Sequence, residues 1–309
     1  LRERGVALVF VSHKLEESLQ VSQDVTILRN GKHIISGIAS EFDRKSLTQY
    51  ITGRDVSEAR EITSPVMTAK PLMEVSHLCS SGAFNDVSFT LHSGEILGIT
   101  GLLGSGRTEI AEALFGVRPA ESGTIEIDGQ AIRVRTIRDA IKAGIGYLPE
   151  DRLTQGLFLD KSVGDNIIAG SLDKHRSAFG LLDGEGISKT TQSMFDRLKI
   201  KAKSVSAPVR SLSGGNAQRV VLGKLLANQP KVLILNGPTV GVDIGSKEQI
   251  LEILRNEANL GRGVIVISDD SLELVSVCNR VLVVRQGEIV DTLTGSQITA
   301  TNIQEMTTA

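Results

Sequence analysis

The sequence is poor in the residues that would mark a disulfide-rich, metal-binding or membrane-spanning chain. It has only two cysteines in 309 residues, Cys79 and Cys278, which lie far apart and form no CxxC pair. This argues against a disulfide framework or a zinc site and favours a reducing cytosol. The longest apolar runs, such as VALVFV (6–11), are far shorter than the roughly 20 residues of a membrane-spanning helix.

The chain also lacks a strong charge of one sign, and its first residues do not predict a signal peptide. Its formal net charge is −2, from 34 basic and 36 acidic residues, so no overall field draws it to nucleic acid or anionic lipid. Residue 1 is Leu and charged residues follow at once, which does not fit a secretory signal. We therefore expect a chain that begins inside a gene product and reaches a membrane only through a partner.

The two ends of the sequence match each other without gaps. GVALVFVSHKLEESLQVSQDVTILRNG (5–31) aligns with GRGVIVISDDSLELVSVCNRVLVVRQG (261–287), which places His13 on Asp269 at an offset of 269 − 13 = 256. Each copy predicts a buried strand, a loop, a short helix and two short strands around a glycine turn. A chance likeness between the β-rich ends of two α/β domains is the alternative.

The repeat predicts a division into domains. Residues 1–55 are then the C-terminal remnant of a first copy, and residues 72–309 are a complete second copy. Residues 56–71 are polar, lack periodicity and contain two prolines, which predicts a linker.

Inside the second copy, apolar runs alternate with helical segments, which predicts an α/β fold with a parallel sheet covered by helices. The runs are EILGITG (95–101), GIGYLP (144–149), KVLILN (231–236) and GVIVIS (263–268). Residues 160–228 are helical in character, with a loop-like break near 180–187. A small antiparallel sheet is predicted by three segments that alternate around turns: MEVSHL (73–78), DVSFTLHSGE (86–95) and TIEIDGQAI (124–132).

GLLGSGRT (101–108) fits the phosphate-loop pattern GxxxxGK[ST] at every position except the lysine, which is Arg107. Its glycines let backbone N–H groups turn inward around phosphate oxygens, and the start of the next helix favours an anion. Thr108 stands where a hydroxyl binds magnesium. A tight strand-to-helix connection without a ligand is the alternative.

SLSGGN (211–216) opens a second helix with glycine at two first-turn positions. Ser213 is placed to cap this helix, and Gly214 and Gly215 would leave several N–H donors exposed, a surface that can hold a terminal phosphate. Glycine weakens a helix, so its presence here indicates a close approach. A simple cap with flexible glycines is the alternative.

Three motifs in this order and spacing, GLLGSGRT, LSGGN and LILNGPTVGVD (233–243), resemble the ATP-binding cassette of ABC transporters. VSHKLEE (11–17) is similar to the switch-histidine segment of such a cassette. The resemblance implies a P-loop (RecA-like) α/β cassette with a small antiparallel β-subdomain and an α-helical subdomain. Together with YLPEDR (147–152) and GVDIGSK (241–247), the motifs resemble the second cassette of double-cassette importers for ribose, galactose, xylose and autoinducer-2.

The resemblance implies that ATP and Mg²⁺ are the ligands, that Thr108 binds the metal weakly and that His13 is a switch histidine of a first cassette. It further implies pairing between cassettes, integral-membrane sugar permease subunits and a periplasmic or extracellular sugar-binding protein as partners, and no nucleic acid. The location would be the cytoplasmic face of the bacterial inner (plasma) membrane, as a peripheral protein. The nucleotide-binding positions that carry over are Gly101, Gly104, Ser105, Gly106, Arg107, Thr108, Glu150, Ser213, Gly214, Gly215, Asn216 and Asp243.

Several positions depart from the family pattern. Arg107 stands where the family has Lys, so a planar guanidinium group replaces a compact ammonium group. Asn236 stands where the family has the Asp that binds magnesium, so the site loses a negatively charged ligand for this hard cation. Gly237 stands where a catalytic Glu belongs, Asp269 where the switch His belongs, and Glu150 where a Gln is usual. These changes predict a degenerate site, whereas SLSGGN is intact.

Loss of a positioned base costs on the order of 10²–10⁴ in rate. We therefore expect this phosphate loop to bind nucleotide weakly and to hydrolyse it negligibly, unless Asp243 or Asp269 substitutes. The intact LSGGN would serve the phosphate loop of the first cassette, together with His13, in an ATPase whose activity this chain lacks when alone.

Three functions remain open at this point. The first is a sugar-importing transport ATPase, the second a non-hydrolysing, nucleotide-dependent scaffold, and the third a soluble ABC ATPase of DNA repair or translation. The last lacks support from any long coiled coil or basic arm. Phe84 fits a core strand better than an adenine contact, and the remaining histidines have no metal-ligand spacing: His33, His77, His92 and His175.

Overall fold

The computed structural model describes residues 4–12, 15–29, 31–52, 70–177 and 180–308. Residues 1–60 belong to one compact unit, and residues 61–241 and 250–309 belong to a larger one. No helix in the described part of the chain is long and apolar enough to cross a membrane.

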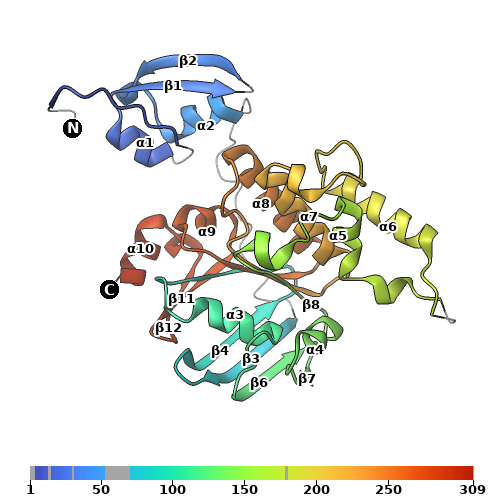
Figure 1. The fold of residues 1–309 in the computed structure, drawn as a ribbon. Helices are drawn as coiled ribbons and strands as arrows, with labels where there is room; N and C mark the ends of the chain where they lie inside the picture. The colour runs from blue at the N-terminus through green and yellow to red at the C-terminus, as the bar shows by residue number, and fades with distance from the viewer. Residues whose placement is uncertain (1–3, 13–14, 30, 53–69, 178–179, 309) are drawn as a thin grey trace. The chain divides into compact units, whose positions relative to one another are not determined.

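A six-stranded sheet with the order β12-β11-β5-β10-β9-β8 forms the centre of the larger unit (Figure 1). Strands β11, β5, β10, β9 and β8 run parallel, and β12 joins the edge antiparallel to β11. The bounds are β5 Ile96–Thr100, β8 Ile145–Leu148, β9 Val232–Asn236, β10 Gly263–Ile267, β11 Arg280–Arg285 and β12 Glu288–Thr294. All residues of β5, β8, β9 and β10 are buried, so the predicted parallel sheet is confirmed.

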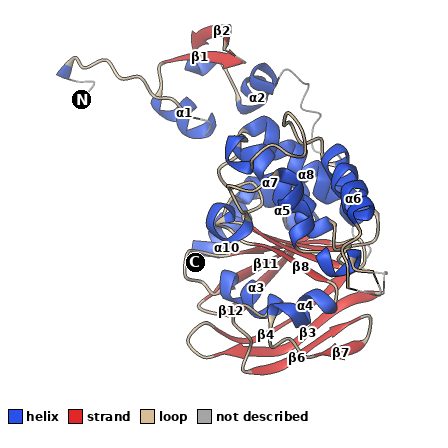
Figure 2. Cartoon of the chain, turned by 45° about the vertical axis from the view of Figure 1, so that its right-hand side comes forward, coloured by secondary structure: helices blue, strands red, loops and turns tan. Residues whose placement is uncertain are grey.

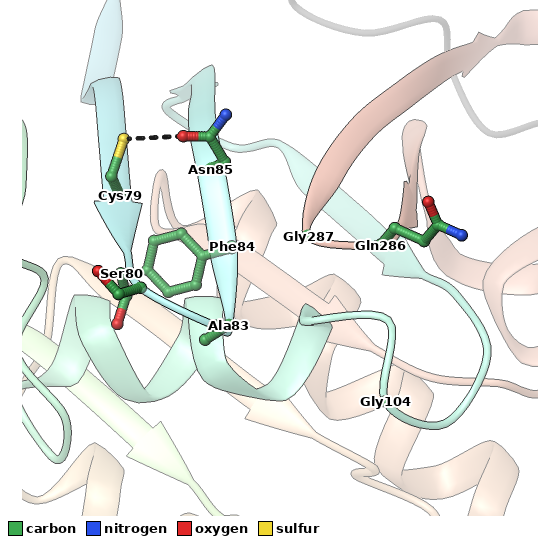
Figure 3. Close-up of a pocket in the computed structure, with 10 residues that line it drawn as sticks. Cys79, Ser80, Ala83, Phe84, Asn85, Gly104, Gln286 and Gly287 are labelled. Atoms are coloured by element: carbon green, nitrogen blue, oxygen red, sulfur yellow. Dashed lines mark hydrogen bonds between the residues drawn. The ribbon is translucent and has the colours of Figure 1, made fainter.

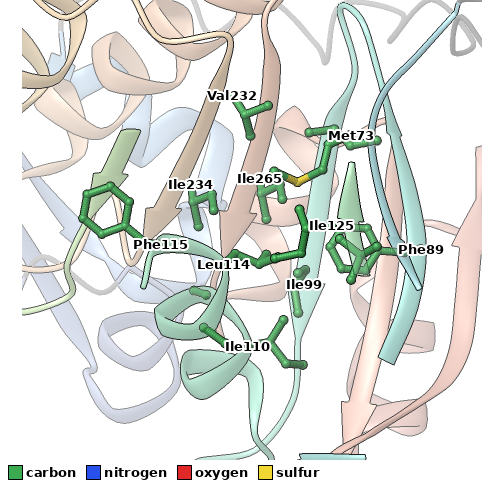
Figure 4. Packing of buried hydrophobic residues seen from close by; sticks show 14 of the residues in the cluster. Met73, Phe89, Ile99, Ile110, Leu114, Phe115, Ile125, Val232, Ile234 and Ile265 are labelled. Atoms are coloured by element: carbon green, nitrogen blue, oxygen red, sulfur yellow. The ribbon is translucent and has the colours of Figure 1, made fainter. Parts of the chain in front are cut away.

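A second, antiparallel sheet of four strands has the order β4-β3-β6-β7, as predicted. Its strands are β3 Pro71–Ser80, β4 Phe84–His92, β6 Ser122–Ile127 and β7 Gln130–Ile132. Helix α3 (Arg107–Phe115) contributes Ile110 and Leu114 to a core shared with both sheets (Figure 4). The core therefore fixes the start of α3, where the phosphate loop ends.

Helices α5 (Val163–Ala169), α6 (Gly184–Arg197) and α7 (Gly214–Leu226) lie together, away from the four-stranded sheet (Figures 1 and 2). The break predicted near 180–187 is wrong in its extent, because α6 already begins at Gly184. Asp183 accepts a hydrogen bond from the Gly186 backbone N–H, and this cap offsets the cost of glycines in the first turn. The other helices are α4 Ile137–Lys142, α8 Ile244–Asn259, α9 Ser271–Val277 and α10 Ala300–Thr308, with shorter turns at η3 Arg152–Gly156, η4 Leu172–His175, η5 Val209–Ser211 and η6 Gly295–Gln297.

The smaller unit repeats the C-terminal part of the larger one, element by element. Its elements are α1 Leu15–Val21, β1 Asp24–Arg29, β2 Lys32–Ile38, η2 Ala39–Glu41 and α2 Arg44–Thr52. Each begins and ends 256 residues before its counterpart among α9, β11, β12, η6 and α10 (for α1 and α9, 271 − 15 = 256). Even the strand irregularity between Ile27 and Leu28 recurs between Val283 and Val284. The repeat predicted from residues 5–31 therefore extends to residue 52.

One part of the repeat differs. The sequence predicts a buried strand over residues 6–11, but these residues carry no regular structure, and Val9 and Val11 are 93% and 92% exposed. Strand β10, the counterpart, lies between β5 and β9, whereas β1 and β2 pair only with each other in the described part of the chain. An apolar segment without neighbouring strands has no ladder to join.

Candidate functional site

The phosphate loop connects β5 to α3 and contains two glycines with left-handed backbone conformations, Gly104 (φ 79°) and Gly106 (φ 99°). A Cβ atom at Gly106 would lie 2.6 Å from the carbonyl oxygen of Ala83, so only glycine fits this position. Helix α3 then begins at Arg107. The N–H groups of its first turn have no partners within the helix and can face an anion.

Two polar side chains of this loop are buried without a hydrogen-bond partner. They are the Ser105 hydroxyl and the Nη1 atom of Arg107, in residues that are 6% and 8% exposed. The nearest carboxylate oxygen to Arg107 is Oδ2 of Asp269, 3.8 Å from Nη2. Unpaired buried donors are costly, so their presence indicates a position for an anionic ligand.

Asn236 ends β9 and lies beside the phosphate loop. Its Nδ2 atom donates to the Thr108 hydroxyl at 3.3 Å. It also hydrogen-bonds to the hydroxyl of Tyr147, whose pKa burial raises to about 12 while this hydrogen bond opposes the rise. The side-chain amide is therefore bonded to two hydroxyl groups.

The position after Asn236 has no side chain. Gly237 has φ 61°, and its backbone N–H donates to the Ile267 carbonyl at 2.8 Å. A Cβ atom here would lie 2.8 Å from Val240 Cγ2 and 3.4 Å from Glu150 Cγ. No group is available at residue 237 to orient or deprotonate a water molecule.

The structure brings together the phosphate loop and the positions that depart from the pattern. Asn236 ends β9 and Asp269 follows β10, and because the strands are parallel, their carboxyl ends share the edge at which the phosphate loop leaves β5. Glu150 follows β8 and lies near Gly237. The two residues at the Thr108 position fit Mg²⁺ poorly, because Asn236 is a neutral amide and the Thr108 hydroxyl already accepts its hydrogen bond. No group of three or more His, Cys, Asp or Glu in the described residues could hold a metal ion.

The SLSGGN segment lies at the start of α7. Ser213 occupies the N-cap position, but the predicted side-chain cap is wrong, because its hydroxyl makes no cap bond and instead accepts from Asn216 Nδ2 at 2.9 Å. Asn216 Oδ1 accepts from the Lys201 N–H at 2.7 Å. The first-turn N–H groups are therefore left uncapped by Ser213, which is exposed.

Gly214 is required by a close approach, as its place in the motif predicts. A Cβ atom at this position would lie 2.6 Å from the carbonyl oxygen of Gly241. Gln218, one turn further along α7, donates to the Pro238 carbonyl at 2.7 Å. Helix α7, which the SLSGGN segment opens and which we call the signature helix, is thus packed against the segment that follows β9.

Arg152 is a structural residue of the site that sequence reasoning missed. It is 8% exposed, and its guanidinium donates to the carbonyl groups of Val240 and Gly241. Burial lowers its pKa. The only signal in the sequence was its position at the end of YLPEDR. The presence of an arginine there does not by itself predict which groups it binds.

Asp243 is engaged within its own segment. Its two carboxylate oxygens accept from the Ser246 N–H and hydroxyl at 3.0 and 2.7 Å. Burial raises its pKa, but the hydrogen bonds from Ser246 and from the backbone of Asp243 and Gly245 together leave the pKa below the ordinary value.

The remaining candidates separate into core, surface and undescribed residues. Phe84 is 4% exposed and belongs to the core, as expected, and it also lines a cavity of about 450 Å³ beside Gly104 and Gly287 (Figure 3). His77 pairs with Asp86 at 2.6 Å. His13 lies outside the described residues.

Comparison with known proteins agrees with this geometry. A sequence model of the ABC transporter family matches residues 84–240. A "putative ribose/galactose/methyl galactoside import ATP-binding protein" of Halalkalibacterium halodurans is 35% identical over 308 residues, which are 100% of this chain and 59% of that protein. A "ribose import ATP-binding protein" of Chelativorans sp. is 41% identical over 94% of this chain and 57% of its own length. The chain thus spans less than two thirds of the length of these relatives.

Solved structures support the fold. A nucleotide-free ATP-binding cassette from an ABC transporter aligns with a TM-score of 0.67 at 18% identity, over 76% of this chain and 96% of that one. CbiO1 of Clostridium perfringens, part of an ABC transporter complex, aligns with a TM-score of 0.61 at 25% identity, over 72% and 88%. With its phosphate loop, its signature helix and the match of the family model over half of its length, the chain belongs to the ABC transporter family.

Proposed function

We propose that the protein is the ATP-binding subunit of an importer for a monosaccharide or a similar small polyol-type solute. The relatives that support this are described as import ATP-binding proteins for ribose, galactose and methyl galactoside. Such a subunit would couple ATP binding and hydrolysis to transport, with integral-membrane permease subunits and a sugar-binding protein as partners. Its location would be the cytoplasmic face of the bacterial inner membrane.

Within this function, residues 72–309 act as a second cassette whose own site does not turn over. The observation that carries this is the end of β9, where Asn236 is neutral and Gly237 has no side chain. Residues 1–55 would be the end of a first cassette, joined through 56–71. The common offset of 256 residues between the elements of the smaller unit and those from α9 to α10 supports this division.

The intact signature segment gives the second cassette its role. Ser213 is exposed at the start of α7, with its hydroxyl not used as a cap. It is therefore free to approach the terminal phosphate of a nucleotide bound to another phosphate loop, with His13 acting at that same site. A non-hydrolysing nucleotide-dependent scaffold is the alternative, and it is favoured by the lack of a base at residue 237.

The division of labour is tested by sugar uptake in the cells that encode this chain. Ser213→Arg, introduced in the gene, places a long cation at the signature helix, and we expect ribose or galactose uptake to fall by at least about tenfold, since a positioned catalytic contribution is worth 10²–10⁴. Ser188→Arg, on the exposed face of α6, is the matched control and leaves uptake unchanged.

Arg107→Ala distinguishes the two sites. Arg107 belongs to the nucleotide site of residues 72–309, which does not hydrolyse nucleotide in this proposal. We therefore expect Arg107→Ala to lower uptake far less than Ser213→Arg does. Equal loss of uptake from both substitutions contradicts the asymmetry, and full uptake with Ser213→Arg contradicts the transport role of the signature segment.

A further inference from the structure

We infer that the phosphate loop of this chain binds the polyphosphate of a nucleotide that carries no divalent metal, with Arg107 as its counter-charge. The inference rests on the proposed function in one respect, namely that this loop takes a nucleotide. It departs from the family's usual ligand, a magnesium complex, because the residues around Thr108 are of the wrong kind for a cation.

The side chain next to the Thr108 hydroxyl is a hydrogen-bond donor. Asn236 Nδ2 points its protons at the Thr108 hydroxyl, 3.3 Å away, and Asn236 is also bonded to Tyr147. Magnesium needs oxygen ligands, with at least one carboxylate in sites of this type. A neutral amide lacks the negative charge of a carboxylate, and the Thr108 hydroxyl already accepts a hydrogen bond from it.

Two carboxylates that might replace Asn236 each face another group of the chain. Asp269 lies at 3.8 Å from Arg107 Nη2, and the side chain of Asp269 is 77% exposed. Asp243 uses both oxygens to accept from Ser246. No cluster of metal-ligating side chains occurs elsewhere in the part of the chain that the structure describes.

The same site is well suited to a bare anion. Arg107 is 8% exposed and its Nη1 atom has no partner, as is true of the buried Ser105 hydroxyl. A phosphate without metal can accept from the guanidinium fork, the hydroxyl and the uncapped N–H groups at the start of α3 together. A metal ion bound to those phosphate oxygens would compete with the guanidinium for them.

The inference is tested by calorimetric titration of this chain with ATP, once in excess EDTA and once in excess Mg²⁺. We expect binding in EDTA and an apparent affinity at least about tenfold weaker in Mg²⁺, which corresponds to about 1.4 kcal/mol. The reason is that Mg²⁺ removes the free ATP that the loop selects. Tighter binding in Mg²⁺, or no binding in EDTA, overturns the inference.

Variants locate the effect at the site. Asn236→Asp restores a carboxylate and should make binding tighter in Mg²⁺ than in EDTA, whereas Asn256→Asp, at an exposed position of α8, should keep the preference for EDTA. Arg107→Ala should abolish binding in EDTA. Asp269→Asn should tighten binding in EDTA, because it removes a negative charge close to the ligand's counter-charge.

The outcomes also separate this inference from the proposed function. If Asn236→Asp and the unmodified chain both bind ATP more tightly in Mg²⁺, the metal-free mode is wrong and nucleotide binding stands. If neither binds ATP under either condition, nucleotide binding by this loop fails as well. The uptake result with Ser213→Arg depends on the signature helix and is unaffected by either outcome.

Discussion

At the scale of single residues, two adjacent residues, Asn236 and Gly237, determine which polar groups are available at the end of β9. Asn236 is 3% exposed and bonded to Thr108, and Gly237 adopts φ 61°, a conformation in which a side chain is strained. If residues 236 and 237 hold the positions of the metal ligand and the base, as proposed, replacing one of them alone would not rebuild a hydrolytic site. The hydrogen bonds of Asn236 give the buried neutral amide partners within the chain.

Tyr147 reports on this arrangement through its ionisation. Burial raises the pKa of its hydroxyl to about 12, whereas a tyrosine in an unfolded chain ionises near about 10. Between these values the unfolded chain has lost a proton that the folded chain keeps, so the free energy of unfolding falls as the pH rises from 10 to 12. This contribution is fully present below pH 10.

The measurement is an ultraviolet titration of tyrosinate in the Tyr50→Phe variant. The chain has two tyrosines and no tryptophan, so the variant leaves Tyr147 as the only phenol. We expect a midpoint near 12, and a second titration in urea should give a midpoint near 10. A midpoint near 10 in the folded variant would show that the hydroxyl is not buried.

At the scale of elements, an ion pair joins helices that are distant in sequence. Glu257 of α8 is 2% exposed and accepts from Arg197 of α6 and from Arg262. A buried carboxylate is costly unless its cationic partners are present. Its removal would take the carboxylate partner from both Arg197 and Arg262, although Arg262 would keep its hydrogen bond to the Pro230 carbonyl. The contact therefore fixes α6, and with it the helical part of the cassette, to the central sheet region.

Glu257→Ala should lower the free energy of unfolding by about 3–5 kcal/mol, the usual cost of breaking a buried pair from one side. Urea denaturation followed by circular dichroism measures it. Glu252→Ala, at an exposed position of the same helix, is the matched control and should change the value by less than about 0.5 kcal/mol. Equal losses would mean that helix propensity, and not the ion pair, determines the result.

At the scale of the whole molecule, residues 6–11 form an exposed apolar stretch in the described part of the chain. Leu8, Val9, Phe10 and Val11 are 56–93% exposed. Contiguous exposed apolar residues with unpaired backbone groups favour association with another chain. The segment has the sequence of a buried strand and, in the described part of the chain, lacks the flanking strands that its counterpart β10 possesses.

We therefore expect the chain to self-associate as its concentration rises. The double variant Val9→Lys with Val11→Lys should instead have the mass of a single chain. Light scattering after size-exclusion chromatography measures this. Leu260→Lys replaces an isolated exposed leucine of 66% exposure and should leave the association unchanged. If the double variant still associates, the surface that mediates self-association lies outside residues 6–11.

The sequence by itself determined the parallel sheet, the antiparallel sheet, the phosphate loop and the signature helix. Periodicity, glycine position and motif order depend on local chemistry, which a single chain reveals. The sequence also revealed the repeat, because residues 5–31 align with residues 261–287 without gaps even though few of the paired residues are identical. The proposal of a degenerate site at Asn236 and Gly237 also came from the sequence, since each is a change of residue type.

Only the tertiary structure decided which of these groups are paired. Sequence reasoning could not tell that Ser213 leaves its helix uncapped, that Arg152 bonds to the carbonyls of Val240 and Gly241, or that Asn236 donates to Thr108. It also predicted a strand over residues 6–11 that has no ladder to join. Hydrogen-bond partners and strand neighbours come from segments far apart in the chain, so their identity is set by packing and not by local pattern.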